Sequence, residues 1–138
     1  MTDYTITNNV AGSSLGVKPQ VVEVVLDFTS TSLTTSDSVE VFSLKAGTYV
    51  LSAAIEVTQL ASTGSPVLDL GDDADDAVFV AALAGHTALA TGTTSAGKFY
   101  AAADTIDLIA NTATFDGKCR VVAVIAELGD AETAAAFA

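Results

Sequence analysis

Cysteine, tryptophan and basic residues are scarce in this chain of 138 residues. Cys119 is the only cysteine, so no disulfide can form within the chain, and stability has to come from packing or from association with other subunits. Five Lys and Arg stand against 17 Asp and Glu, which gives a formal net charge of −12. Because this charge repels phosphate backbones and anionic lipids, we expect neither nucleic acid nor a membrane surface as a partner.

Long hydrophobic runs are also missing, although half of the residues are hydrophobic. No uninterrupted apolar stretch approaches the ~20 residues that are needed to cross a bilayer. The first ten residues, MTDYTITNNV, lack the basic start and the apolar core of a secretion signal. We therefore expect synthesis in a cytoplasm, and the length suits one domain of the usual ~100–150 residues.

The sequence offers little that points to catalysis. No GxGxxG occurs, and no GxxxxGK is followed by Ser or Thr, so nucleotide chemistry has no support. His86, the one histidine, would act as a base only if a nucleophile and an acid met it in space, and we interpret it as a surface residue. Paired carboxylates could cleave sugars, but no Trp is present to form a sugar platform. We expect no catalytic residue and no cofactor, with hydrolysis as a minor alternative.

Alternating apolar residues predict an all-β protein. Residues 21–28, VVEVVLDF, place Val22, Val24 and Leu26 on one face of a strand, opposite Glu23 and Asp27. Turn residues recur about every 8–12 positions and helical periodicity is missing before residue 129, so we predict a single-domain β-sandwich or jelly roll. The clearest of about eight strand candidates lie at residues 21–28, 38–44, 48–59, 67–70, 78–83, 105–110 and 118–128.

Three segments lack a strand pattern. Residues 1–20 have only scattered apolar positions among Gly, Ser and Asn, and we predict an extended N-terminal arm. Residues 84–97 are rich in Ala, Thr and Gly, and we predict a long loop. Residues 129–138 are predicted as a mobile or short helical C-terminal tail, because isolated helices of this length are marginal in water.

The last predicted strand, residues 118–128, is apolar on both faces. If the rest of the chain covers only one face, a second copy has to cover the other, so we predict a homo-oligomer. An extended arm can also add a strand to a neighbouring sheet. The predicted interaction residues are Val122 and Val124 of this strand and five apolar positions of the arm, Tyr4, Ile6, Val10, Leu15 and Val17.

Strand alternation also assigns individual side chains to faces. Cys119 falls on the opposite face from Lys118 and Arg120, so we interpret it as a small hydrophobic residue and not as an activated thiol. In residues 48–59 the same alternation predicts one shared face for five side chains, those of Tyr49, Leu51, Ala53, Ile55 and Val57.

An acidic run follows the predicted strand at residues 67–70. Clustered carboxylates at a sharp turn are the ligands that calcium takes, which makes Asp72, Asp73, Asp75 and Asp76 weak metal candidates. The spacing departs from the DxDxDG pattern of helical calcium loops, and no Glu follows at the bidentate position. The favoured interpretation is a solvated turn that protects a sheet edge from aggregation.

Two sequence motifs, together with their order along the chain, resemble those of a known family. LDLGD at residues 68–72 is followed by DDAVF, and ADTIDL at residues 103–108 is followed by the closing strand GKCRVVAVIAEL. With the strand VVEVVLDF, this order resembles that of small virion structural proteins of tailed bacteriophages, marine and cyanophage ones in particular. The resemblance spans most of residues 21–128.

The resemblance implies a β-sandwich that decorates the head shell. Such a decoration, or cement, protein binds the outer surface of the capsid across capsomer seams, with the major capsid protein as its partner. The resemblance alone favours a homotrimer. The alternative that it leaves open is a head or tail fibre module that binds a host surface glycan.

Overall fold

Nine β-strands make up the regular structure of the computed structural model, which describes residues 18–87, 89–93 and 97–128. The strands are β1 (Gln20–Asp27), β2 (Ser38–Leu44), β3 (Thr48–Gln59), β4 (Val67–Gly71), β5 (Val80–Ala84), β6 (Thr91–Thr93), β7 (Lys98–Tyr100), β8 (Asp104–Asn111) and β9 (Lys118–Glu127). The predicted all-β class is confirmed. Within the described ranges, no helix has the length and apolar character needed to cross a membrane.

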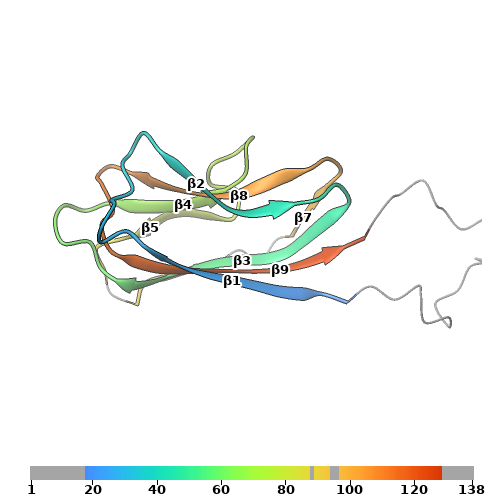
Figure 1. Cartoon of the computed structure of the whole chain (residues 1–138), viewed down its shortest axis with the longest axis horizontal. Helices are drawn as coiled ribbons and strands as arrows, with labels where there is room; N and C mark the ends of the chain where they lie inside the picture. Colours follow the sequence, from blue (N-terminus) through green and yellow to red (C-terminus); the bar gives the residue numbers. More distant parts are fainter. Residues whose placement is uncertain (1–17, 88, 94–96, 129–138) are drawn as a thin grey trace, which may run out of the picture.

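The strands form two antiparallel sheets that pack face to face (Figure 1). One sheet has the order β1-β9-β3-β6, with β7 also paired to β3, and the other has the order β2-β8-β4-β5. Neighbours in each sheet are mostly far apart in sequence, since β1 pairs with β9 and β2 pairs with β8. The predicted β-sandwich is therefore confirmed.

The segment 84–97 is not simply the loop that was predicted. β6 pairs with β3 inside this segment, and β7 pairs with the start of β3 directly after it. Both strands are three residues long, so their own sequences carry almost no period-two signal. Pairing with a long neighbouring strand, and not local propensity, determines their conformation.

A bulge in β3 changes the face that its first residues present. The register with β9 shifts between Val50 and Ser52, so Leu51 is an extra residue in the strand. Thr48 and Val50 are buried, and Leu51 is 37% exposed. The prediction that Tyr49 and Leu51 share the buried face of Ala53, Ile55 and Val57 is wrong, because the bulge inverts the alternation.

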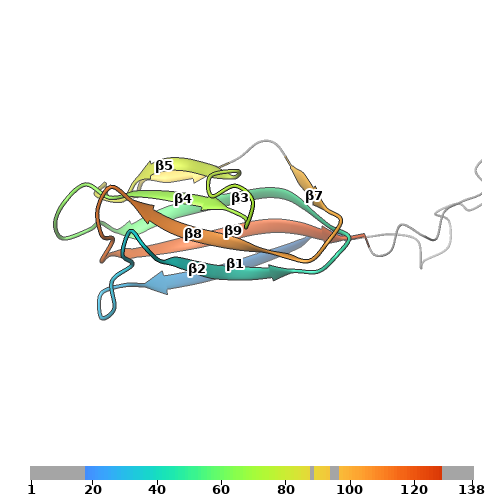
Figure 2. The ribbon, with the colours of Figure 1, turned by 90° about the horizontal axis from the view of Figure 1, so that it is seen from above.

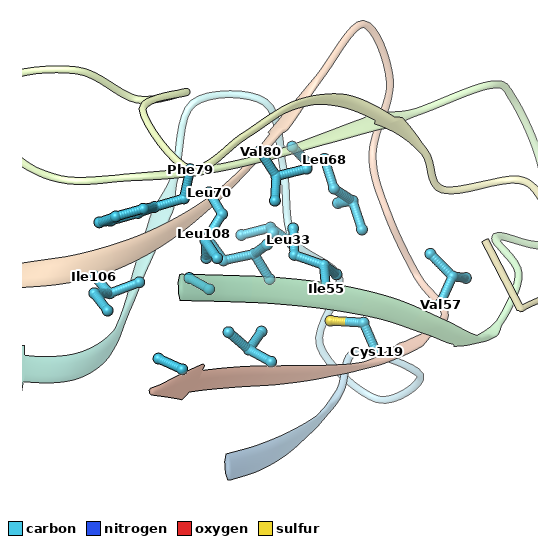
Figure 3. Packing of buried hydrophobic residues seen from close by; sticks show 14 of the residues in the cluster. Leu33, Ile55, Val57, Leu68, Leu70, Phe79, Val80, Ile106, Leu108 and Cys119 are labelled. Atoms are coloured by element: carbon cyan, nitrogen blue, oxygen red, sulfur yellow. The ribbon is translucent and has the colours of Figure 1, made fainter. Parts of the chain in front are cut away.

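The space between the sheets is filled by aliphatic side chains from both layers (Figure 3). Ile55 from one sheet and Leu68, Leu70 and Leu108 from the other are fully buried. Burial of each such side chain stabilises the fold by about 1.5–3 kcal/mol. Around Ile55 in β3, buried residues alternate with half-buried ones, whereas β4 and β8 are buried on both faces over most of their length.

The residues that were predicted as arm and tail lie largely outside the described part of the chain. Of residues 1–20 the structure describes Lys18 and Pro19, which are exposed, and Gln20, with which β1 begins. Tyr4, Ile6, Val10, Leu15 and Val17 are not among the described residues, and neither are residues 129–138.

Candidate interaction surfaces

The outer side of the sheet that contains β1, β9 and β3 carries an apolar surface. Antiparallel register places Val21 of β1 beside Val124 of β9, and places Ala54 of β3 beside Val122. We name this surface the valine face and define it by Val21, Val25, Ala54, Val122 and Val124. Two of these, Val21 and Val25, are 70% and 55% exposed.

The valine face has no second layer in the described part of the chain. The sheet forms the lower layer in Figure 1, and no strand lies on its outer side. The two predicted interaction residues of β9, Val122 and Val124, are half-buried at the centre of this face. On the other side of the same strand, Cys119, Val121 and Ala123 are buried in the core. The closing strand is thus apolar on both sides, with one side covered by the chain itself.

A charged pair lies within the valine face. The Arg120 Nε atom is 3.5 Å from the Glu23 Oε1 atom, and both side chains are about half exposed. Pairs of this kind contribute about 0–1 kcal/mol in water. Their value at an interface is in orientation, because a partner has to match one positive and one negative group at fixed positions.

β1 is the edge strand of its sheet. It pairs with β9 along its whole length, and no other described strand pairs with its outer side. β2 is the edge of the second sheet, and Figures 1 and 2 show both edges on the same flank of the sandwich, one in each layer. An unpaired edge presents backbone N–H and C=O groups that can pair with another chain.

The acidic turn after β4 packs against the outside of the second sheet. In Figure 1 this turn rises from the upper layer between β4 and β8. Its backbone passes directly over Gly71, where an added Cβ atom would lie 2.0 Å from the Asp75 carbonyl oxygen. Only glycine permits this approach, so Gly71 fixes the path of the turn.

Asp72 does not belong to a solvated turn. Its side chain is fully buried, and Oδ1 accepts hydrogen bonds from the backbone N–H groups of Ala74 and Asp75 at 3.0 and 2.9 Å. Oδ2 accepts from Lys98 Nζ at 2.5 Å and from Tyr100 Oη at 2.7 Å. Because Lys98 and Tyr100 belong to β7 in the opposite sheet, Asp72 links the two layers.

The contacts of Asp72 determine its protonation state. Burial by itself raises the pKa of this carboxyl, but hydrogen bonds from Lys98, Tyr100 and two backbone N–H groups outweigh burial and lower it. Burial and the carboxylate together raise the pKa of Tyr100. The site is therefore an ionised aspartate held by a phenol and an ammonium group. Because donors of the protein occupy both oxygens, the prediction of a solvated turn is wrong for Asp72 and holds for the exposed Asp73, Asp75 and Asp76.

Asp69, the first carboxylate of the acidic run, also has a structural role. Its Oδ1 atom accepts a hydrogen bond from the Ala82 N–H at 2.7 Å, and Oδ2 accepts from the Asn111 side-chain amide. Ala82 has a φ of 54°, in the left-handed region. The bond to Asp69 supports this irregular point in β5, where the register with β4 also shifts.

A groove of about 360 Å³ lies beside the acidic turn. We name it the acidic groove; its lining residues are Thr35, Ser36, Asp37, Ser38, Asp72, Asp73, Asp76, Asp107, Ile109 and Asn111. Three of the four weak metal candidates line it, and Asp75 does not. Asp107 was missed in the sequence because it lies in β8, more than 30 positions from the turn. Its polarity within the strand DTIDLIAN was the only signal available.

Asp107 is the unusual member of this groove. It is 6% exposed, and its Oδ1 atom has no hydrogen-bond partner in the described structure. Burial, together with the carboxylates of Asp73 and Glu40, raises the pKa of Asp107, although a hydrogen bond from Thr105 opposes this shift. The pKa values of Asp72 and Asp107 are thus shifted in opposite directions.

The two remaining reactive side chains lie where the sequence indicated. Cys119 is fully buried on the core side of β9, and burial raises the pKa of its thiol to about 12. It is therefore a protonated hydrophobic residue at neutral pH, as predicted. His86 is exposed in the turn after β5, so its interpretation as a surface histidine is confirmed.

Comparison with solved structures gives the fold a context. Three bacteriophage capsid structures contain chains with this fold. The acidic stable capsid of Helicobacter pylori bacteriophage KHP30 matches with a TM-score of 0.61 at 12% identity, over 87% of this chain and 92% of that one. The cyanophage Pam1 capsid matches with a TM-score of 0.61 at 20% identity, over 89% and 95%.

The third match is to the capsid of Ralstonia phage GP4, with a TM-score of 0.57 at 15% identity, over 92% of each chain. Neither the protein-family models nor the curated proteins that were compared match the sequence. At these identities the likeness shows a shared fold. The likeness covers nearly the full length of each matched chain, so each of these chains is itself a single sandwich of this size.

Proposed function

We propose that this protein is a structural component of a phage virion, and that it decorates the outer head shell as a cement protein. The observation that carries the proposal is the near full-length fold match to chains in three phage capsids. The uncovered valine face supports it, because a protein that acts by contact needs an apolar surface that its own chain leaves open. The role requires rigid packing and no chemistry.

The strand order supports a finer description of the fold. The first sheet contains β1, β9, β3 and β6, and the second contains β2, β8, β4 and β5. If β7 is counted as an extension of β6, eight strands divide into two four-stranded sheets, as in a jelly roll. We infer that the sandwich is a jelly roll, an architecture that viral capsid domains use.

We propose the major capsid protein and other copies of this chain as the partners. Many weak contacts across capsomer seams combine through multivalency, so each copy can bind modestly and still stabilise a shell. In this proposal the valine face packs against another copy or against a capsomer, and a strand from a neighbouring chain pairs with the edge of β1. For copies around one axis we propose a trimer, which the resemblance to decoration proteins favours.

Shell binding tests the proposal directly. Purified protein is mixed with empty expanded heads of its own phage, and the particles are separated by sedimentation and imaged by electron cryomicroscopy. We expect density at symmetry-related positions on the outer surface, and shells that resist a higher temperature. Absence of binding to every head form, together with binding to host cells, would favour the glycan-binding fibre module instead.

Removal of residues 1–17 tests the proposed arm. This truncation leaves β1 intact, because β1 begins at Gln20. We expect a folded protein that has lost its attachment to the shell or its trimer. Unchanged attachment and an unchanged oligomer would show that residues 1–17 have no role in docking.

A further inference from the structure

Asp107 lines the acidic groove and carries a carboxylate oxygen that no described donor satisfies. The residue is 6% exposed, and its Oδ1 atom has no hydrogen-bond partner in the described structure. A buried oxygen without a donor costs about 1–3 kcal/mol, and more when the group is charged. Such an oxygen needs an explanation, and a cation that supplies the missing positive partner is one.

The neighbours of Asp107 are also acidic, so a positive charge at this position would be stabilised further. The Asp73 carboxyl lies within hydrogen-bonding reach, and Glu40 stands opposite Asp107 in the register of β2 and β8. The described residues that line the groove include no Lys or Arg. Lys98, the nearest candidate along the chain, is already bound by Asp72. Two acceptors that face one another need a shared proton or a cation between them.

We propose that the acidic groove binds a divalent metal cation, with Asp107 and Asp73 as its two carboxylate ligands. A hard cation of the calcium type takes six to eight oxygens in flexible geometry, including those of hydroxyl groups, amides and water. The lining supplies Asp76, Ser38 and Asn111 as further oxygen donors. The proposal shifts the site from the acidic run to the contact between that run and β8.

The ligand set predicts weak binding. In the described residues no three Asp, Glu, His or Cys side chains already surround one point, so neutral oxygens and water have to complete the shell. Sites of this composition bind Ca²⁺ with Kd of about 0.1–1 mM. Mg²⁺, which demands octahedral geometry at shorter distances, binds more weakly in such an open site.

Calorimetric titration of the full chain with CaCl2, after treatment with a chelator, tests the site. We expect one saturable site per chain and a rise of the melting temperature with Ca²⁺ concentration. Asp107→Asn and Asp73→Asn each weaken binding by about tenfold or more, since each removes a charged ligand. Asp75→Asn is the matched control: it removes the same charge from the same turn, and Asp75 does not line the groove.

Two outcomes would overturn the proposal. Absence of saturable binding up to about 10 mM Ca²⁺ would mean that Asp107 and Asp73 share a proton instead. Equal losses for Asp75→Asn and Asp73→Asn would mean diffuse attraction to an acidic surface. Asp73 is exposed, so Asp73→Asn decides the question even if Asp107→Asn fails to fold. Shell binding does not enter this test, so its result is independent of the proposed virion role.

Discussion

The outer faces of the two sheets differ in their chemistry. The sheet of β1, β9 and β3 presents valines and two charged pairs, whereas the sheet of β2, β8 and β4 presents carboxylates beneath an acidic turn. The valine face gains free energy when another protein covers it, because apolar burial contributes about 25 cal/mol per Å². The acidic groove gains when a cation enters. One molecule thus has a side suited to a protein partner and a side suited to solvent and ions.

The largest expected effect concerns Asp72, whose hydrogen bonds link the two sheets. Asp72→Ala removes four hydrogen bonds and leaves Tyr100 Oη buried without its acceptor. We expect a loss of about 3 kcal/mol in the free energy of unfolding, the lower end for a broken buried pair, because Lys98 is 36% exposed. Urea denaturation measures it.

Asp75→Ala is the control for this variant. Asp75 is exposed, and its side chain accepts one bond, from the Ala77 N–H at 3.0 Å. A loss of about 0.5 kcal/mol is expected. Similar losses for Asp72→Ala and Asp75→Ala would show that Asp72 does not link the sheets.

The next effect is on association through the valine face. Val21→Asp combined with Val25→Asp introduces two charges at exposed positions of β1, so the fold should persist. We expect association between copies, or with the shell, to weaken by about 100-fold, since a charge in an interface core is left without a partner. Light scattering after size exclusion measures the oligomer.

Ala101→Asp combined with Ala102→Asp is the matched control for the valine face. Both alanines are exposed in the turn between β7 and β8, and the change in net charge is the same. Association should be unchanged within about twofold, because surface substitutions away from an interface are nearly neutral. If the control pair also disrupts association, net charge and not the valine face is responsible.

Asp72 and Asp107 should respond to pH with opposite signs. The pKa of Asp72 is lowered from 3.8 in the fold, so its stabilisation is present above pH 3.8 and is lost as the pH falls further. The pKa of Asp107 is raised, so its contribution is fully present below pH 3.8 and is lost as the pH rises through its folded value.

Asp107→Asn should therefore raise the melting temperature of the chelated protein at pH 7, and the gain should vanish near pH 4. Thermal unfolding between pH 3 and pH 8 measures it. Addition of Ca²⁺ should reduce or reverse this difference at pH 7, because the wild type binds the ion more tightly and gains more stability from it. A gain that is independent of pH would contradict the assignment of the effect to the carboxylate charge.

The smallest expected effect concerns Cys119. With a pKa raised to about 12 and no exposed surface, the thiol should be inert to a disulfide reagent in the native protein and reactive after unfolding. Cys119→Ala should cost about 1 kcal/mol, mainly from lost packing. Fast labelling of the native state would show that β9 opens locally.

The sequence was sufficient for the features that depend on alternation. The bounds of β2 and β3 were predicted without error, and β9 ends one residue earlier than expected, because long runs of alternating residues report burial directly. The bulge at Leu51 escaped prediction, since an extra residue inverts the faces without any change in composition. β6 and β7 escaped because their partner is remote in sequence.

The candidate surfaces were predictable to different degrees. The outward position of Val122 and Val124 could be predicted because alternation along β9 assigns them to the face opposite Val121 and Ala123, and their role in interaction stays a prediction. Asp72 and Asp107 could not be separated from the other carboxylates, since their environments depend on Lys98, Tyr100 and Asp73, which other elements supply. Burial of a charge is a property of the assembled sheets.

The glycine at the end of β4 has a consequence for how this surface can evolve. Gly71 and Asp72 hold the turn from below, through a close backbone contact and bonds to Ala74 and Asp75. The outward side chains at positions 73, 75 and 76 contribute little to that path. Related chains should therefore keep Gly-Asp whatever they carry at these three positions, so the turn can gain or lose the proposed cation ligands Asp73 and Asp76 while the sandwich beneath it stays the same.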